Sequence, residues 1–110
     1  MPKYLLVLET EPTEPSREQE YHEWYNKIHI PDVCETKGFV KATRYELKEL
    51  TKGSTKPRFL VIYEIETDDL EAVKAKHSKN MAQKRDQGRS TSVNEVSSRA
   101  MYEQIFSYPE

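Results

Sequence analysis

Cysteine, glycine and long apolar stretches are scarce in this sequence of 110 residues. Its one cysteine, Cys34, cannot form an intramolecular disulfide, which excludes the disulfide framework typical of small secreted proteins. The longest apolar run, residues 4–8, is too short to cross a bilayer, and the N-terminus has no basic segment followed by an apolar stretch. We therefore expect a cytoplasmic protein with no export signal and no membrane partner.

An excess of charge of one sign is also absent. The 17 basic and 19 acidic residues are interspersed and give a net charge of −2 at pH 7, so no cluster of Lys and Arg is available to neutralise a phosphate backbone. The three glycines are isolated, and no serine-centred nucleophile motif occurs. We therefore expect no nucleic-acid partner, no cofactor of the nucleotide type and no acyl-enzyme chemistry.

The residues that are present suffice for one domain, residues 1–110, with a small core. Hydrophobic residues make up 35% of the chain and charged residues 33%, which is close to the lower edge of globular composition. Seven tyrosines and one tryptophan favour ordered packing, because aromatic rings bury a large apolar area. We expect a folded chain whose core is supplemented by a partner subunit.

Hydrophobic patterning predicts the order β–α–β–β–α–β. Strands are predicted at residues 3–10, 39–50, 58–66 and 101–108, with a hairpin connection at 51–57 and a polar loop at 89–98. The first helix is predicted to begin at Ser16 with a capping box to Gln19, and the second to be capped by Thr67 or Asp68. This order is typical of an α+β, ferredoxin-like fold, in which a four-stranded antiparallel sheet carries two helices on one face.

Both faces of the predicted strands are apolar, although two helices can cover only one. In the strand at 58–66, Phe59, Val61 and Tyr63 alternate with Leu60 and Ile62. The simplest cover for the second face is the sheet of a second copy, so we expect a homodimer.

The residues EWYNKIHIPDV at 23–33, followed by GFVKATRY at 38–45, resemble the motif of EthD-like proteins, small members of the dimeric α/β-barrel superfamily. The resemblance implies ferredoxin-like protomers whose sheets pair into a barrel. It also implies a histidine near the mouth of a cavity, at the position of His29. Relatives include cofactor-free monooxygenases, isomerases, polyketide cyclases and lyases, so the resemblance implies a fold more strongly than a reaction.

His29 is the first candidate for a catalytic residue, because it lies just before Pro31, where the helix must bend or restart. An imidazole can transfer protons near neutral pH, and Asp32 is the candidate that orients it. Alternatively, His29 and Asp32 only stabilise the bent turn. A metal site formed with His22 is disfavoured, because His22 and His29 lie about 10 Å apart along a helix.

Candidate substrate-binding residues lie on the same helix and on two strands. Trp24, Tyr25, Tyr45 and Tyr63 can supply an apolar wall with phenolic donors, and Arg44 can bind a substrate oxyanion. The alternatives are that the aromatic rings are core residues and that Arg44 pairs with Glu64. His77, at an apolar position of the second helix, is expected to be a core or boundary residue.

The leading hypothesis is a cofactor-independent enzyme that acts on a small aromatic or enolisable molecule in a dimeric barrel. His29 would move the proton, Asp32 would orient it, and Arg44 with the tyrosines would hold an oxyanion. The alternative from another class is a non-catalytic, metabolite-binding or accessory protein of an oxygenase or degradation system. Haem binding through a histidine, as in distant barrel relatives, is a third hypothesis.

Overall fold

The computed structural model describes residues 1–49 and 58–110. The predicted hairpin connection at 51–57 and the end of the second strand at Leu50 lie outside these residues. The elements are, in chain order, β1 (Lys3–Pro12), a 3₁₀ turn η1 (Pro15–Arg17), α1 (Glu18–Trp24), a π-helical turn η2 (Tyr25–His29), α2 (Ile30–Val33), β2 (Phe39–Glu46), β3 (Phe59–Glu66), α3 (Leu70–Asp86) and β4 (Asn94–Glu103).

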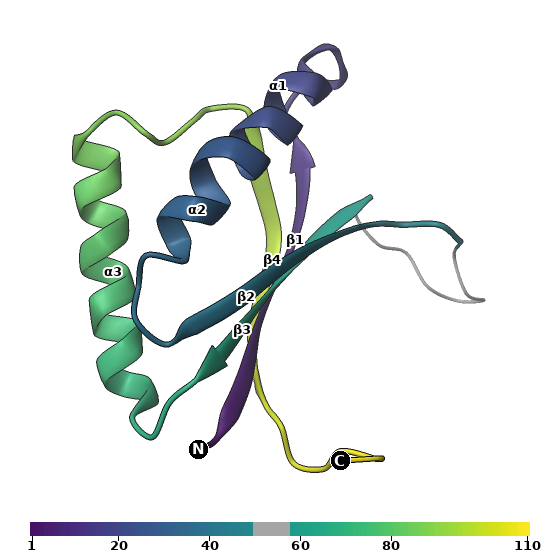
Figure 1. The fold of residues 1–110 in the computed structure, drawn as a ribbon. Coiled ribbons are helices and arrows are strands. Elements are labelled where there is room, and N and C mark those ends of the chain that lie inside the picture. The colour runs from purple at the N-terminus through teal and green to yellow at the C-terminus, as the bar shows by residue number, and fades with distance from the viewer. Residues whose placement is uncertain (50–57) are drawn as a thin grey trace.

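The four strands form one antiparallel sheet in the order β2-β3-β1-β4. The helices α1, α2 and α3 all lie on one face of this sheet, and the other face is uncovered in the single chain (Figure 1). The predicted ferredoxin-like α+β fold is therefore confirmed.

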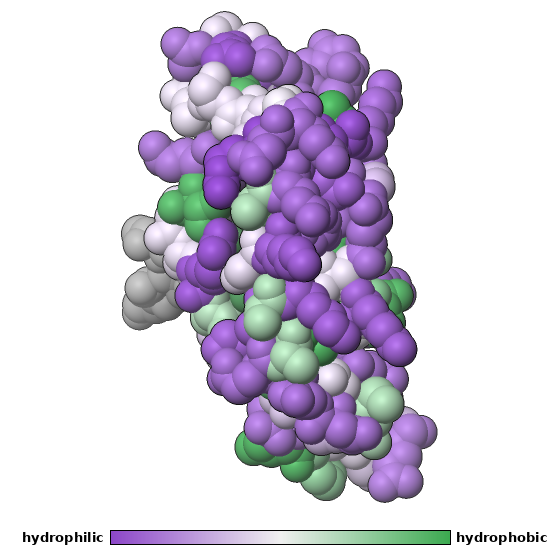
Figure 2. Space-filling model, turned by 90° about the vertical axis from the view of Figure 1, so that its left-hand side faces the viewer, coloured by the Kyte–Doolittle hydropathy of each residue, from purple (hydrophilic) through white to green (hydrophobic). Residues whose placement is uncertain are grey.

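The core lies between the sheet and the helices. Alternate residues of β1 and β3 point toward the helices and are buried, whereas the residues between them point to the uncovered face. The buried residues of these two strands are Leu6, Leu8, Thr10, Phe59, Val61, Tyr63 and Ile65. The outer surface of the helix-bearing side is mainly hydrophilic, as Figure 2 shows. No helix within the two described parts of the chain is long and apolar enough to cross a membrane.

The first helical segment is interrupted where the sequence predicts a break. Pro31 has no amide hydrogen, and its ring would crowd the carbonyl of Lys27 in a regular α-helix. The chain widens into the π-helical turn at Tyr25–His29 and then restarts as α2, with Pro31 in its first turn. The predicted capping box is wrong, because Glu14 occupies the N-cap and Pro15 takes the first helical turn without a side-chain cap.

Two positions fix α3 against the rest of the fold. Asp69, one residue after the predicted cap, accepts a hydrogen bond of 3.1 Å from the amide of Ala72. Gly38 has a φ of 110°, and a Cβ atom built there would lie 2.8 Å from Cγ2 of Val73. Glycine at this position therefore permits both the backbone conformation and the close approach of α3.

The last strand lies earlier in the chain than predicted. It runs over Asn94–Glu103, so half of the predicted polar loop is strand and residues 104–108 are not. Because it is an edge strand with few buried side chains, it has no apolar alternation for sequence patterning to detect. Residues beyond it leave the sheet, and Ile105, Phe106 and Tyr108 are exposed there.

Candidate functional site

A cleft of about 460 Å³ opens between the sheet and the helices on the helix-bearing side. It is bounded by the sheet, by the segment from Trp24 to Val33, by α3 and by residues 89–91. The residues that line this cleft are Leu6, Leu8, Trp24, His29, Asp32, Val33, Tyr63, His77, Ser78, Met81, Lys84, Arg85, Arg89, Ser90, Thr91 and Arg99. Its size suits a small organic ligand.

His29 enters the cleft from the last position of the π-helical turn. Its ring stacks on Trp24, with ring centroids 4.3 Å apart and an interplanar angle of 13°, and it makes a T-shaped contact with Tyr25, with ring centroids 5.4 Å apart. Burial lowers the pKa of His29 to about 4, and the charge of Asp32 opposes this while His77 and Arg99 add to it. His29 is therefore neutral at pH 7 and able to accept a proton.

Asp32 lines the cleft, and its hydrogen-bond partner is Arg89 and not His29, which it is predicted to orient. Its side chain is almost fully buried, and Arg89 Nε donates to its Oδ2 at 2.6 Å. Arg89 in turn accepts a hydrogen bond of 2.9 Å from Trp24 Nε1 at its backbone carbonyl. In the part of the chain that the structure describes, Asp32 makes no direct hydrogen bond to His29, and the two residues are linked by contacts through Arg89 and Trp24.

Two residues that line the cleft each carry a buried polar atom with no hydrogen-bond partner within the described residues. These atoms are the hydroxyl oxygen of Tyr63, a residue that is 1% exposed, and Nδ1 of His77. The pKa of Tyr63 is raised and that of His77 is lowered, in both cases mainly by burial. Buried polar groups are usually hydrogen-bonded, so an unpaired group that lines a cleft is one that a ligand can satisfy.

The cleft is also rich in cationic side chains. Arg89 is paired with Asp32, and Lys84 Nζ lies 2.7 Å from Oε1 of Glu35. Arg85 and Arg99 have no ion-pair partner in the described segments. Among the lining residues that the structure describes, Asp32 is the one carboxylate, so they carry an excess of positive charge.

Three predicted binding residues lie outside the cleft. Tyr25 is buried behind His29, and Arg44 lies under α1, 3.0 Å from Oδ1 of Asn26 and 4.8 Å from the ring centroid of Tyr25. Tyr45 points to the uncovered face of the sheet and is 52% exposed. A bulge in β2 between Phe39 and Lys41 sets this arrangement.

The same register separates the charges that were expected to pair. Arg44 lies opposite Val61 on the helix-bearing face, whereas Glu64 lies opposite Lys41 on the uncovered face. The alternative of an Arg44–Glu64 pair is therefore wrong. Arg44 instead contacts His22, with Nη2 3.1 Å from Nδ1 of the ring.

His77, Arg89 and Arg99 are among the residues of the cleft that the sequence does not predict as site residues. His77 was interpreted as a core or boundary residue, and Arg89 and Arg99 fell in or beside the predicted polar loop. The unbroken helical spacing of Leu70, Val73, His77 and Met81 was the one available signal, because it places a histidine on the face that α3 turns to the sheet. No pattern in the chain identified Arg89 or Arg99.

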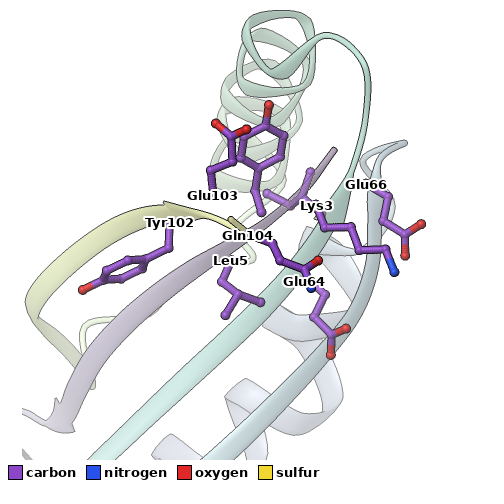
Figure 3. Close-up of a pocket in the computed structure, with 9 residues that line it drawn as sticks. Lys3, Leu5, Glu64, Glu66, Tyr102, Glu103 and Gln104 are labelled. Carbon is purple, nitrogen blue, oxygen red and sulfur yellow. The ribbon is translucent and has the colours of Figure 1, made fainter. Parts of the chain in front are cut away.

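A second hollow, of about 390 Å³, lies at one end of the sheet. Leu5, Glu64 and Tyr102 project into it from β1, β3 and β4 (Figure 3). It contains no histidine, and Leu5 and Tyr102 belong to the uncovered face. Within residues 1–49 and 58–110, no three His, Cys, Asp or Glu side chains lie close enough together to bind one metal ion, and this includes those that line the cleft and the hollow.

Comparison with known proteins identifies a family and a fold. A family model described as "Domain of unknown function (DUF4286)" matches residues 8–99. A search of curated proteins gave no significant match.

Three solved structures share the fold at low sequence identity. HapK from Hahella chejuensis has a TM-score of 0.65 and 13% identity, with 94% of each chain covered. An ethyl tert-butyl ether (EthD) family protein from Bacillus halodurans C-125 has a TM-score of 0.59 and 15% identity, over 96% of this chain and 100% of that one. A dimeric ferredoxin-like protein from an uncultured marine organism has a TM-score of 0.59 and 12% identity, over 97% and 99%. The resemblance to EthD-like proteins is thus confirmed at the level of the fold.

Proposed function

The chain belongs to the DUF4286 family, a domain of unknown function, and we propose that it is a cofactor-independent enzyme that transfers a proton on a small aromatic or enolisable molecule. The observation that carries this proposal is His29 in the cleft, neutral at pH 7 and held by stacking on Trp24. A neutral imidazole in a fixed orientation, beside a space that fits a small molecule, is the arrangement a general base requires.

In the proposed reaction, His29 removes a proton from a carbon next to a carbonyl group. The C–H bond breaks, the proton moves to the imidazole, and the electron pair passes to the carbonyl oxygen as an enolate. The protonated imidazole then returns the proton to the same or another atom of the enolate. The step needs no oxidant and no second substrate.

Some of the neighbouring residues are proposed to contact the substrate, and others to hold His29 in position. Trp24 and Tyr63 line the cleft and provide its aromatic wall. Asp32 is a positioning residue, because its ion pair with Arg89 fixes the carbonyl that accepts from the Trp24 indole. Tyr25 supports the imidazole from behind, and Arg44 and Tyr45 take no part in the proposed site.

The protein is further proposed to act as a homodimer, joined through the uncovered sheet face. Leu5, Val7, Leu60, Ile62 and Tyr102 place apolar side chains on this face, and Leu5 and Tyr102 are more than a third exposed. A second copy is the occupant that would cover them by symmetry, and the dimeric ferredoxin-like neighbour supports this choice.

An exchange assay that requires no known substrate tests the enzymatic proposal. A panel of enolisable aromatic and aliphatic carbonyl compounds is incubated with the protein in deuterium oxide, and incorporation of deuterium at carbon is followed by NMR. The intact protein is expected to accelerate exchange in at least one compound, and His29→Gln to slow it by about 100-fold or more, the range of a general base. Lys79→Gln, an exposed change on α3 that does not line the cleft, serves as the control.

Exchange that persists unchanged in a folded His29→Gln protein would rule out the role of His29. Binding of a panel member in the cleft without exchange would instead favour the accessory, metabolite-binding protein. Native mass spectrometry of the same samples gives the assembly mass, and a monomer would contradict the dimer.

A further inference from the structure

The proposed reaction leaves one side of the cleft without a role. Arg99 and His77 line the cleft but are not used by the proton transfer, and the hydroxyl of Tyr63 has no partner there. These three groups come from β4, α3 and β3, so the fold brings together residues that are distant in the sequence.

We propose that the ligand of this cleft is a small organic acid, and that its carboxylate is bound by Arg99 with the hydroxyl of Tyr63 and His77 beside it. This inference rests on the proposed function, because it assumes that the cleft is the ligand site.

Arg99 is the most suitable cation because of its position in the sheet. It lies opposite Leu8, a buried residue of the helix-bearing face, so its side chain projects toward the helices and not toward the uncovered face. Its charge acts on His29, His77 and Tyr63 together, lowering the pKa of each. It therefore lies within electrostatic range of both the proposed base and the unpaired polar groups.

The other cations of the cleft suit this role less well. Arg89 and Lys84 already contact the carboxylates of Asp32 and Glu35 at 2.6 and 2.7 Å. Arg85 is unpaired in the described chain, but it lies in the last turn of α3 and is not among the charges that act on His29, His77 and Tyr63. Arg99 combines a charge that is unpaired among the described residues with a side chain that lines the same cleft as Tyr63 and His77.

A carboxylate matches the chemistry of this site. The planar guanidinium group binds a carboxylate through two parallel hydrogen bonds, and a buried hydroxyl can donate a further one. Burial without a partner is unfavourable for the Tyr63 hydroxyl, and a ligand oxygen would remove that cost. The described lining residues include one carboxylate, that of Asp32, and the ligand would supply a second.

The anion also has a consequence for the proton transfer. A negative charge bound near His29 opposes the effects of burial and of Arg99, and so raises the pKa of the imidazole toward its usual value. His29 would become a stronger base when the acid is bound. In the free protein the same residue stays neutral and weakly basic.

Pairs of acids and their neutral amides test this inference. Phenylacetate is compared with phenylacetamide, and benzoate with benzamide, by titration into isotope-labelled protein observed by NMR. We expect the acids to shift the resonances of Arg99, Tyr63 and His77 and to bind roughly 10-fold more tightly than the amides, equivalent to one charge-assisted contact. The His29 titration should move to higher pH in the acid complex.

Variants separate the role of Arg99 from a general effect of charge. Arg99→Gln should abolish the preference for acids, and Arg99→Lys should retain part of it. Arg17→Gln, which removes the same charge from the surface of η1 where Arg17 pairs with Glu20, should retain all of it. A backbone amide spectrum of each variant verifies that it is folded.

Each outcome decides between the two proposals. Equal binding of acids and amides in the cleft, or an acid preference that survives in Arg99→Gln, would overturn the carboxylate site while leaving the cleft as the ligand site. Phenyl phosphate binding in preference to every carboxylate would overturn the assigned class. If no compound shifts any cleft resonance, both the inference and the proposed function fail.

Discussion

His29 owes its unusual titration mainly to burial beside two aromatic rings. Trp24 covers one face of the imidazole and Tyr25 meets its edge, and the pKa falls to about 4 although Asp32 lies nearby. The groups that face His29 from other elements, His77 and Arg99, lower the pKa further. The residue is thus kept neutral by its surroundings and is not held by a carboxylate partner.

This shift predicts a pH-dependent stability. Between pH 6.5 and about 4 the unfolded chain binds a proton at His29 and the folded chain does not, so the free energy of unfolding decreases as the pH is lowered. We expect His29 to contribute roughly 1–3 kcal/mol to this decrease, and His29→Gln to reduce it. Urea unfolding at a series of pH values measures the effect. NMR titration of the His29 ring provides the control, and a midpoint near pH 6.5 would contradict the prediction.

Two of the three buried tyrosines of the core, Tyr63 and Tyr21, are expected to respond in opposite ways when their hydroxyl is removed. The Tyr63 hydroxyl has no partner, so Tyr63→Phe is expected to leave the free energy of unfolding unchanged or to raise it by about 1 kcal/mol. The Tyr21 hydroxyl is hydrogen-bonded to Thr10, so Tyr21→Phe is expected to lower it by about 1 kcal/mol. Chemical denaturation of both variants checks this, and equal losses would show that the Tyr63 hydroxyl is satisfied in solution.

At the residue scale, sequence alone indicated part of the cleft. His29 and Asp32 were selected because Pro31 breaks the helix after them, and the structure places both on the cleft with Trp24 and Tyr63. Tyr45 faces away from the helices because one extra residue in β2 changes which side chains face them, whereas Arg44 faces the helices but contacts His22 and Asn26 outside the cleft. A bulge of this kind depends on backbone pairing, so the hydrophobic alternation of the sequence does not predict it.

At the scale of the elements, the strands with buried side chains are the ones that the sequence predicts accurately. β1 and β3 are central strands with regular alternation, and both were predicted nearly at their observed bounds. β4 is an edge strand whose pairing with β1 is made by backbone groups, and its polar sequence was interpreted as a loop. The helix break was predicted correctly because proline acts locally.

The contact between the β2 entry and α3 predicts a contrast between two glycines. Gly38→Ala adds a methyl group 2.8 Å from Val73 at a φ of 110°, and is expected to destabilise the protein by about 2–4 kcal/mol. Gly88→Ala meets no atom within 4 Å at a φ of 75°, and is expected to cost about 1 kcal/mol from backbone strain alone. Thermal and urea unfolding of both variants measure the difference. Equal losses would show that the packing of Val73 does not limit this site.

At the scale of the whole molecule, the core between the sheet and the helices buries only part of the apolar residues of the sheet. Val7 and Ile62 are paired across β1 and β3 in the middle of the uncovered face. The small core and the apolar outer face together explain how a chain with 35% hydrophobic residues can still form a stable unit, if two copies share that face.

A charge in the middle of this face is expected to prevent association. Val7→Lys or Ile62→Lys should convert the proposed dimer to a monomer, because a buried ammonium group would have no partner at the two-fold interface. Ala75→Lys, an exposed change on α3, is the matched control and should leave the assembly intact. Native mass spectrometry and size-exclusion chromatography measure the change. An unaltered mass for both sheet variants would place the interface elsewhere.

The polar composition of β4 and the two register shifts have a further consequence for the behaviour of the chain at high concentration. β2 and β4 are the edge strands, and each carries a bulge that interrupts its backbone pairing. Charged side chains, among them Lys41, Glu95 and Arg99, also lie along these edges. A bent, charged edge is a poor template for the strand of another molecule. The features that concealed β4 from hydrophobic patterning therefore protect the sheet from edge-to-edge aggregation.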